Sequence, residues 1–370
     1  MTLVIVALVR NTNNVMVEDN SIYFIGLMSG TSLDGVDAVL VDKNIKLIEK
    51  HYLRYPDELK NKLHNINNKK IFLTEFADLD LDLANIYAKA CIELINKSNI
   101  SNEKIMAIGA HGQTIFHKPK KYSLQIANPA IIAEKTNINV IADFRMADIA
   151  AGGEGAPLAP YFHKYILAES SAIFVNLGGI ANITLIKNSK TIGFDTGPAN
   201  ILLDNYCKKY FNKDFDKDGE IAKTGRLNYK LLEKMLTDKY FLQEPPKSTG
   251  AEYFNLKWLN KYLPSNIYKN DVMATLTELS AITITKELNP KLDIYLYGGG
   301  VHNKFLITRI KKLAENCNIK NVSAIGIDPD FLEAQAFAYF ARETINKRCS
   351  NEPTVTGAKS KKILGSIYYA

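Results

Sequence analysis

A segment near the N-terminus combines glycine, hydroxyl and carboxylate residues in a way that suits phosphate and metal chemistry. It runs from Gly26 to Asp37 and reads Gly-Leu-Met-Ser-Gly-Thr-Ser-Leu-Asp-Gly-Val-Asp. Glycines permit backbone dihedrals that expose successive amides to an anion. Mg²⁺ in phosphate sites is commonly held by one or two carboxylates and by phosphate oxygens. The segment is therefore either an ordinary hairpin turn or a phosphate cradle in which Asp34 or Asp37 holds Mg²⁺. The predicted cradle comprises Gly30, Thr31, Ser32, Leu33, Asp34, Gly35, Val36 and Asp37.

Two later glycine clusters have the same character. Gly178 and Gly179 lie in Asn-Leu-Gly-Gly-Ile-Ala-Asn, and a run of three glycines follows Tyr297. The first cluster predicts a second hairpin tip against phosphates, and the second predicts close approach of the backbone to adenine or ribose, although each also suits a tight turn. The glycines of the predicted adenosine contact are Gly298, Gly299 and Gly300.

Asp195 stands at the end of an apolar strand pattern and is followed by Thr-Gly-Pro. Pro198 is typical of the first turn of a helix, so Asp195 can cap that helix. It can equally serve as a base, because a carboxylate beside an apolar strand is unfavourable unless it is paired or used.

A third group of polar residues predicts a substrate side. Arg145 has the planar fork that binds both oxygens of a carboxylate. His111 and Asp143 suit sugar hydroxyls, although a hydrogen-bonded structural role fits His111 equally well. Glu333, within an amphipathic pattern, reads by itself as an ordinary exposed helical residue.

The elements that must position these groups form an open α/β pattern with two Gly-tipped hairpins, one in each half of the chain. Helices are expected over 79–96, 198–211, 303–317 and 331–345. Strands are expected over 21–27, 36–42, 47–55, 104–109, 139–142, 172–177, 182–187, 191–194 and 293–297. A duplicated architecture follows, in which the phosphates of a nucleotide are gripped from both sides of a cleft.

Length and composition agree with two folded domains. The chain has 370 residues, of which 46% are hydrophobic and 23% charged. We expect an N-terminal domain over 1–160 and a C-terminal domain over 161–370, with the last helix as a candidate to pack back on the first domain. Residues 1–16 are expected to be a loosely held extension, with Met16 as an alternative start, and residues 1–9 make a poor signal peptide.

The net charge of +7 is spread along the chain, with no aromatic-interleaved basic stripe and no zinc-finger spacing, which argues against nucleic acid as a partner. No apolar run reaches membrane-spanning length, so no membrane partner is expected. The cysteines are too far apart in sequence for a close-paired metal site and favour a reducing compartment such as the cytoplasm. They are Cys91, Cys207, Cys317 and Cys349.

Taken together, these segments resemble the anhydro-N-acetylmuramic acid kinases over nearly the whole chain. The segment from Gly26 to Asp37, Gly-Ala-His-Gly-Gln-Thr, Ala-Asp-Phe-Arg and Gly-Phe-Asp-Thr-Gly-Pro occur in the order of that family. Further matching segments are Pro246–Gly250, Ala274–Thr277, Tyr297–Asn303 and Val355–Ala358. The resemblance implies a two-domain actin-like (ribonuclease H-like) α/β fold with its active site in the interdomain cleft, and a cytoplasmic homodimer.

The resemblance also implies a reaction. ATP with Mg²⁺ phosphorylates 1,6-anhydro-N-acetylmuramic acid at O6 while water opens the anhydro bridge, giving N-acetylmuramic acid 6-phosphate and ADP for peptidoglycan recycling and amino-sugar catabolism. Asp195 is then the general base, Arg145 holds the lactyl carboxylate, and Glu333 contacts the sugar from the other side of the cleft. One departure is Glu154, where the family pattern leads us to expect Gln.

Two other functions stay open at this point. An actin-like ATPase would hydrolyse ATP without a small substrate, and a related kinase would act on another amino sugar or sugar acid. Consumption of ATP that depends on the sugar separates a kinase from an ATPase.

Overall fold

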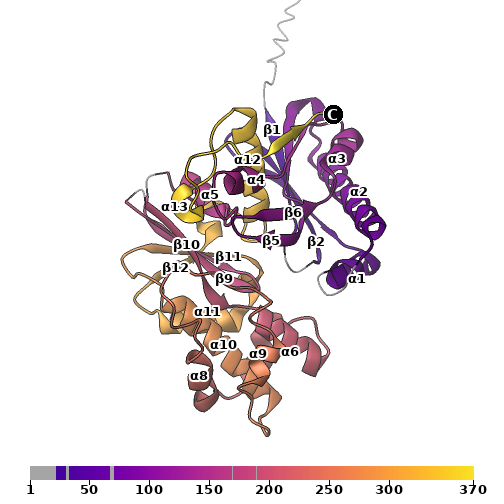
Figure 1. Ribbon diagram of the computed structural model, residues 1–370. Coiled ribbons are helices and arrows are strands. Elements are labelled where there is room, and N and C mark those ends of the chain that lie inside the picture. The colour runs from indigo at the N-terminus through magenta and orange to yellow at the C-terminus, as the bar shows by residue number, and fades with distance from the viewer. Residues whose placement is uncertain (1–21, 31–32, 67–70, 169, 189) are drawn as a thin grey trace, which may run out of the picture.

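The computed structural model describes residues 22–30, 33–66, 71–168, 170–188 and 190–370 (Figure 1). The predicted N-terminal extension, residues 1–16, therefore lies outside the described residues. So do two residues of the predicted phosphate cradle, Thr31 and Ser32.

The first sheet has strand order β13-β7-β4-β1-β2-β3. Its strands are β1 (Tyr23–Met28), β2 (Gly35–Asp42), β3 (Leu47–Arg54), β4 (Ile105–Ala110), β7 (Val140–Ala142) and β13 (Ser366–Tyr368). β1 pairs antiparallel with β2, which pairs antiparallel with β3, whereas β1, β4 and β7 are mutually parallel. The last strand of the chain, β13, adds to the edge beside β7.

The second sheet has strand order β10-β9-β8-β11-β12. Its strands are β8 (Ala172–Leu177), β9 (Ile180–Lys187), β10 (Lys190–Pro198), β11 (Asp293–Tyr297) and β12 (Asn318–Asn321). Three consecutive antiparallel strands are again followed by two parallel ones. Leaving β13 aside, both sheets thus place their strands in the same order with the same directions. The predicted α/β fold class, with a duplicated actin-like architecture, is confirmed.

Helices cover both sheets, and a separate hairpin of β5 (Gln113–Lys118) and β6 (Tyr122–Ile126) extends from the first part. In the first part and its connection to the second the helices are α1 (Asp57–Ile66), α2 (Leu73–Ser98), α3 (Pro129–Thr136), α4 (Met146–Ala150) and α5 (Ala159–Leu167). The later helices are α6 (Ile201–Phe211), α7 (Glu220–Thr224), α8 (Tyr229–Leu236), α9 (Leu256–Asn260), α10 (Lys269–Thr285), α11 (Lys304–Leu313), α12 (Leu332–Ile345) and α13 (Pro353–Thr356). Short 3-10 turns occur over 102–104, 217–219, 299–302 and 322–325. Among the described helices, none combines the length and apolar character that crossing a membrane requires.

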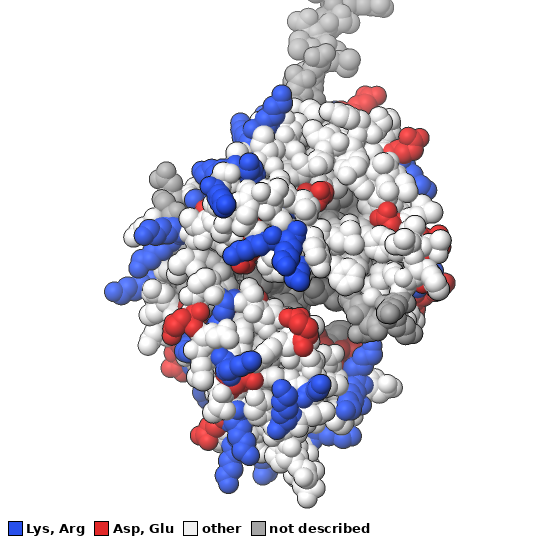
Figure 2. Space-filling view, in the orientation of Figure 1, with Lys and Arg blue, Asp and Glu red and all other residues white. Residues whose placement is uncertain are grey.

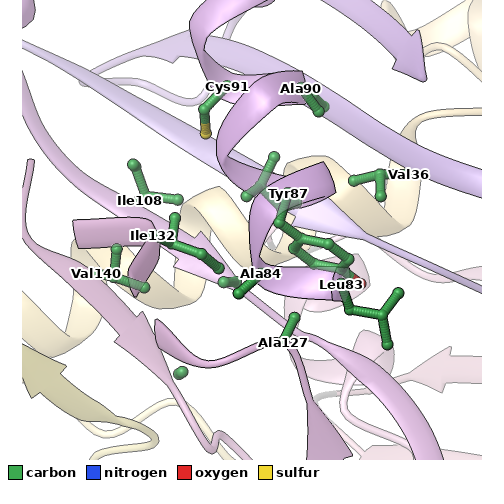
Figure 3. Packing of buried hydrophobic residues seen from close by; sticks show 14 of the residues in the cluster. Val36, Leu83, Ala84, Tyr87, Ala90, Cys91, Ile108, Ala127, Ile132 and Val140 are labelled. Atoms are coloured by element: carbon green, nitrogen blue, oxygen red, sulfur yellow. The ribbon is translucent and has the colours of Figure 1, made fainter. Parts of the chain in front are cut away.

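The long helix α2 provides much of the core of the first part. Its side chains Leu83, Tyr87 and Cys91 are fully buried and belong to one apolar cluster with Val36 of β2 and Ile108 of β4 (Figure 3). This spacing of apolar residues is the helical periodicity that predicted a helix over 79–96. The helix runs from Leu73 to Ser98, longer than its apolar stripe.

Helix α12 lies late in the sequence but packs on the first sheet, against β1, β2 and β4 (Figure 1). The approach is so close that a Cβ on Gly26 would lie 1.9 Å from the Ala334 carbonyl oxygen, and one on Gly109 would lie 2.1 Å from that of Phe337. Glycine is therefore required in β1 and β4 by packing. A second apolar cluster includes Phe337 of α12 and continues through Phe162 of α5 to Phe174 of β8, so it joins the two sheets.

Two predicted helix boundaries are wrong. Pro198 does not begin a helix but ends β10, pairing with Ile180 of β9. β10 is an edge strand, where a residue without an N–H is tolerated. The helix expected over 303–317 is shorter, because Asn303 caps α11 through Leu306 N–H and residues from Asn318 onward pair with β11.

Candidate active site

The first hairpin tip, residues 29–34, joins β1 to β2. Buried hydroxyl groups form hydrogen bonds with Ser29, at its start. The hydroxyl of Tyr87 donates to Ser29 Oγ at 2.6 Å, and the Tyr55 hydroxyl lies 2.7 Å from the same atom. The Gln113 Nε2–H donates to the Gly30 carbonyl at 3.2 Å. These contacts fix Ser29 and Gly30, the described residues through which β1 leads into the tip.

The predicted metal carboxylates follow this tip. Leu33 has a positive φ of 54° and is buried, Asp34 is exposed, and Asp37 projects from β2 after Gly35 and Val36. The Asp34 carbonyl accepts hydrogen bonds from the Tyr55 N–H and the Tyr52 hydroxyl, each at 2.9 Å.

Asp37 lies in a field of other carboxylates. Burial, followed by the charge of Asp34 and then that of Glu333, raises the pKa of Asp37 to about 8, and Asp330 and Asp328 add to the rise. Like charges brought together in this way favour a bound cation. Among the described residues, no three His, Cys, Asp or Glu side chains are grouped closely enough to hold a metal by themselves. The arrangement fits Mg²⁺ held by one or two carboxylates together with phosphate oxygens.

The predicted substrate side is brought together at the ends of β4 and β7. Arg145 donates from Nε and Nη2 to His111 Nε2, at 3.2 and 2.9 Å, and from Nη1 to the Gly155 carbonyl at 3.2 Å. The Nε2 atom can accept only when it carries no proton, so the His111 proton is on Nδ1. Burial and the Arg145 charge together hold the pKa of His111 well below its usual range, which keeps the ring neutral. His111 Nδ1 is buried without a partner among the described residues.

The contacts of Arg145 leave a defined part of its guanidinium unused. Of the five N–H groups, the contacts to His111 and Gly155 occupy one on each nitrogen. Within the described part of the chain, one N–H on Nη1 and one on Nη2 are left for a ligand. An end-on pair of N–H groups on these two nitrogens binds a carboxylate with two parallel hydrogen bonds. Asp143 lies nearby in sequence with a positive φ of 58°, and its side chain is exposed.

Glu333 connects the two groups electrostatically. It stands in the first turn of α12, and burial raises its pKa while the charge of Arg145 lowers it. From sequence alone Glu333 reads as an ordinary exposed helical residue. The structure instead places it where its charge acts on Arg145 and Asp37.

Asp195 lies within β10 and does not precede a helix, so its capping role is wrong. Its Oδ2 accepts the Thr249 N–H at 2.9 Å, its N–H donates to the Lys247 carbonyl at 2.8 Å, and its carbonyl accepts the Tyr240 hydroxyl at 2.7 Å. Burial raises the pKa of Asp195 to about 6, although the Thr249 N–H opposes the rise, and Glu252 adds to it. The side chain is therefore mostly ionised at neutral pH and able to accept a proton.

The glycines of the second sheet divide into two kinds. A Cβ added to Gly178 or Gly179 would make only ordinary contacts, at 3.4 Å or beyond, and one on Gly299 would meet nothing within 4 Å. In contrast, Gly298 has a φ of +82° and its Cβ would lie 2.3 Å from Asn176 Oδ1, and the Cβ of Gly300 would lie 2.7 Å from Leu177. The fold therefore requires glycine at positions 298 and 300. Packing does not explain the glycines at positions 178, 179 and 299.

Three residues that surround Asp195 were given no role from sequence. Tyr240, Lys247 and Thr249 are 45 to 54 positions away along the chain. The only signal for Lys247 and Thr249 was Pro246–Gly250, a segment that resembles the family but offers no obvious chemistry by itself, and Tyr240 had none.

Glu154, the departure from the expected pattern, is partly exposed. Its Oε1 lies 3.8 Å from Lys120 Nζ, and both side chains reach solvent. Its backbone N–H donates to the Thr356 carbonyl at 2.8 Å. Its charge is therefore partly offset at the surface.

Comparison with known proteins identifies relatives of this chain. The family model for anhydro-N-acetylmuramic acid kinase matches residues 22–370. A protein of that name from Hahella chejuensis (strain KCTC 2396) is 44% identical over 362 residues, covering 94% of this chain and 98% of the relative. One from Coxiella burnetii (strain Dugway 5J108-111) is 42% identical over 361 residues, covering 94% and 97%.

Solved structures are more distant. The activator of the 2-hydroxyisocaproyl-CoA dehydratase from Clostridium difficile, with bound ADPNP, is 12% identical, with 88% of this chain and 96% of that chain covered and a TM-score of 0.46. A likeness at this level carries no conclusion about ligand or activity.

Proposed function

The chain belongs to the anhydro-N-acetylmuramic acid kinase family, and from this premise we propose its full reaction. It transfers the γ-phosphoryl group of ATP to O6 of 1,6-anhydro-N-acetylmuramic acid while water adds at C1 and the bond from C1 to the bridging oxygen breaks. The products are N-acetylmuramic acid 6-phosphate and ADP. Further parts of the proposal are a cytoplasmic homodimer that acts in peptidoglycan recycling, and domains divided near residue 160.

Asp195 is the general base in this proposal. It takes a proton from the attacking water, the bridging oxygen stays on C6, and that oxygen becomes the nucleophile toward the γ-phosphorus. The observation that carries the role is the environment of Asp195. Its carboxylate has a pKa of about 6, near the working pH, and one of its oxygens is held by the Thr249 N–H.

In this proposal, carboxylates of the first sheet hold the cation that balances the charge of the phosphates. Asp34 and Asp37 are the residues that would hold Mg²⁺, and the field of carboxylates around Asp37 supports a cation there. Bound Mg²⁺ neutralises charge on the transferred phosphoryl group. The phosphates contact the tip from Gly30 to Asp37 on one side and the glycines Gly178 and Gly179 on the other. Adenosine lies against Gly298–Gly300.

Arg145 recognises the lactyl carboxylate through its end-on pair of N–H groups. Its contacts with His111 and Gly155 support this role, because they fix the plane of the guanidinium before a ligand binds. The predicted contacts of His111, Asp143 and Glu333 with the sugar stay predictions. Since His111 Nε2 already accepts from Arg145, we propose that His111 acts mainly by orienting that side chain.

The experiment that tests the proposal is ATP consumption with Mg²⁺, with and without 1,6-anhydro-N-acetylmuramic acid, followed by the mass of the sugar product. A product heavier by one phosphoryl group and one water supports the coupled reaction. Phosphorylation without addition of water contradicts ring opening. ATP turnover that does not depend on the sugar supports the ATPase alternative. The anhydro sugar without its lactyl group is the matched control for the role of Arg145.

A further inference from the structure

One carboxylate outside the proposed site ties together the two ends of a loop, residues 239–252, that lies between α8 and α9. Asp238 Oδ1 accepts the Tyr240 N–H at 2.9 Å and the Tyr253 hydroxyl at 2.7 Å, which are the two ends of the loop. Its Oδ2 accepts the Trp258 Nε1–H at 2.8 Å and the Tyr262 hydroxyl at 3.0 Å. Burial alone would raise the pKa of Asp238, but these donors together lower it, so the group is ionised.

Aromatic packing closes the same loop. The rings of Tyr240 and Phe254 meet edge to face at 5.3 Å, those of Phe241 and Phe254 stack at 5.5 Å, and Trp258 meets Phe254 at 5.0 Å. Tyr240, Phe254 and Trp258 are buried. The ends of the loop are therefore held by both hydrogen bonds and apolar contact.

Between its ends the loop makes every contact described above for Asp195. Tyr240 binds the carbonyl, Lys247 binds the N–H, and Thr249 binds one carboxylate oxygen. The position of the loop consequently determines where the other oxygen, Oδ1, points. A shift of one end would move all three contacts together, since they belong to one short segment.

We propose that Asp238 is a positioning residue for Asp195, an inference that rests on the proposed role of Asp195 as the general base. By joining Tyr240 to Tyr253, Asp238 holds the loop in the conformation that keeps one oxygen of Asp195 occupied and leaves the other to accept the proton. Asp238 acts through the loop and does not contact the reactants.

The charges that face Asp195 determine how it responds when the loop moves. Burial and Glu252 raise its pKa, and the Thr249 N–H is the interaction that lowers it. The Tyr240 hydroxyl faces the Asp195 backbone, and Lys247 Nζ lies 5.2 Å from the centre of the Tyr240 ring. If the loop loosens, the hydrogen bond from Thr249 weakens, and the pKa of Asp195 rises.

The test is the Asp238→Asn variant, which places an amide N–H₂ among groups that are all donors. We expect kcat to fall about 10- to 100-fold, the range of a misplaced general base. The KM for ATP should change less than about threefold. The acid limb of the kcat/KM profile, which reports the base in the free enzyme, should move up by about half a pH unit or more. Emission from Trp258, the single tryptophan of the chain, reports whether the network has changed.

The matched control is Asp216→Asn. Asp216 is a buried carboxylate that, like Asp238, accepts two N–H groups, here from Ile221 and Ala222, but it does not hold this loop. Its loss should lower stability and leave the pH profile unchanged. If Asp238→Asn does not fold, Tyr253→Phe removes one tie and should move kcat and the acid limb in the same direction by less.

The inference is overturned if Trp258 emission changes while kcat and the acid limb stay as in the wild type, or if Asp216→Asn moves the acid limb equally. Failure of the proposed function would instead appear in the wild-type protein, as ATP consumption that does not depend on the sugar.

Discussion

The first hairpin tips of the two sheets occupy the same place in the strand order but differ in length and charge. The first connection spans residues 29–34 and leads to Asp34 and Asp37, whereas the second consists of Gly178 and Gly179 alone. Basic side chains are spread over both parts of the visible face and do not form a single stripe (Figure 2). One copy of the repeated architecture thus carries carboxylates at and after its tip, whereas the tip of the other consists of two glycines.

In the second sheet the candidate catalytic carboxylate is Asp195, which lies in β10 and not at the first hairpin tip. Its surroundings differ from those of Asp37. Burial and then the charges of other carboxylates raise the pKa of Asp37 to about 8, whereas burial raises the pKa of Asp195 only to about 6, since the Thr249 N–H opposes the rise. The difference suggests a cation ligand in one case and a proton acceptor in the other. The neighbours of each aspartate are therefore the basis for the two different roles that we propose.

The largest effect expected from this comparison is that of Asp195→Asn. The variant keeps the size of the side chain but cannot take a proton, so kcat should fall about 10²- to 10⁴-fold. ATP binding, measured by calorimetry, should be nearly unchanged because the nucleotide does not need the base. Turnover close to that of the wild type would remove Asp195 as the base.

Arg145→Ala should act on the sugar and not on the nucleotide. Loss of hydrogen bonds to a charged group, worth about 1.5 to 3 kcal/mol, should raise the sugar KM about 10- to 100-fold. The KM for ATP serves as the internal control. An unchanged KM for the sugar would contradict the lactyl contact.

Asp37→Asn should raise the Mg²⁺ concentration needed for half-maximal activity by about tenfold or more. It should also change how stability depends on pH. Because the pKa of Asp37 is raised from 3.8 to about 8 on folding, its contribution to stability is complete below pH 3.8 and is lost as pH rises toward and through 8.

The variant does not titrate and lacks this loss. Without Mg²⁺ its stability relative to the wild type should therefore rise between pH 4 and 8 by up to about 5 kcal/mol, because about four pKa units at about 1.4 kcal/mol each separate the two pKa values. Urea unfolding at several pH values measures the difference. A constant difference across this range would show that Asp37 does not titrate as described.

Gly178→Ala and Gly298→Ala should distinguish a glycine that is needed for ligand binding from one that is needed for stability of the fold. The first change makes only ordinary contacts in the protein, so stability should hold while the KM for ATP rises several-fold, if phosphate approaches that backbone. The second has a positive φ and a contact at 2.3 Å, so it should lose on the order of 1 to 3 kcal/mol of stability. Equal losses of stability would end the distinction.

The smallest effect is expected for Glu154→Gln. Exposed ion pairs contribute about 0 to 1 kcal/mol, and Glu154 is already paired with Lys120 at the surface. The KM for the sugar should change less than about threefold, with Lys120→Met as the matched control. A larger improvement in KM for Glu154→Gln would indicate that the charge faces the substrate.

Local sequence patterns were sufficient for most of the fold. Alternating apolar residues located β2, helical spacing located α2 and α12, and glycine clusters located the hairpin tips. These features depend on residues close together in the chain, where periodicity and turn chemistry act directly. The strand expected over 191–194 is present as β10, but its extension to Pro198 was missed because the edge position, which tolerates proline, is a property of the sheet.

Only the tertiary structure decided the surroundings of the candidate site. Besides Asp34, the carboxylates that act on Asp37 come from residues 328–333. The contacts of Asp195 come from residues 240–249, and His111 meets Arg145 across two strand ends. The sequence by itself determined which side chains are available and which local elements carry them. Protonation and orientation depend on burial and on charges a few ångströms away, and these exist only once strands and helices distant in sequence have packed together.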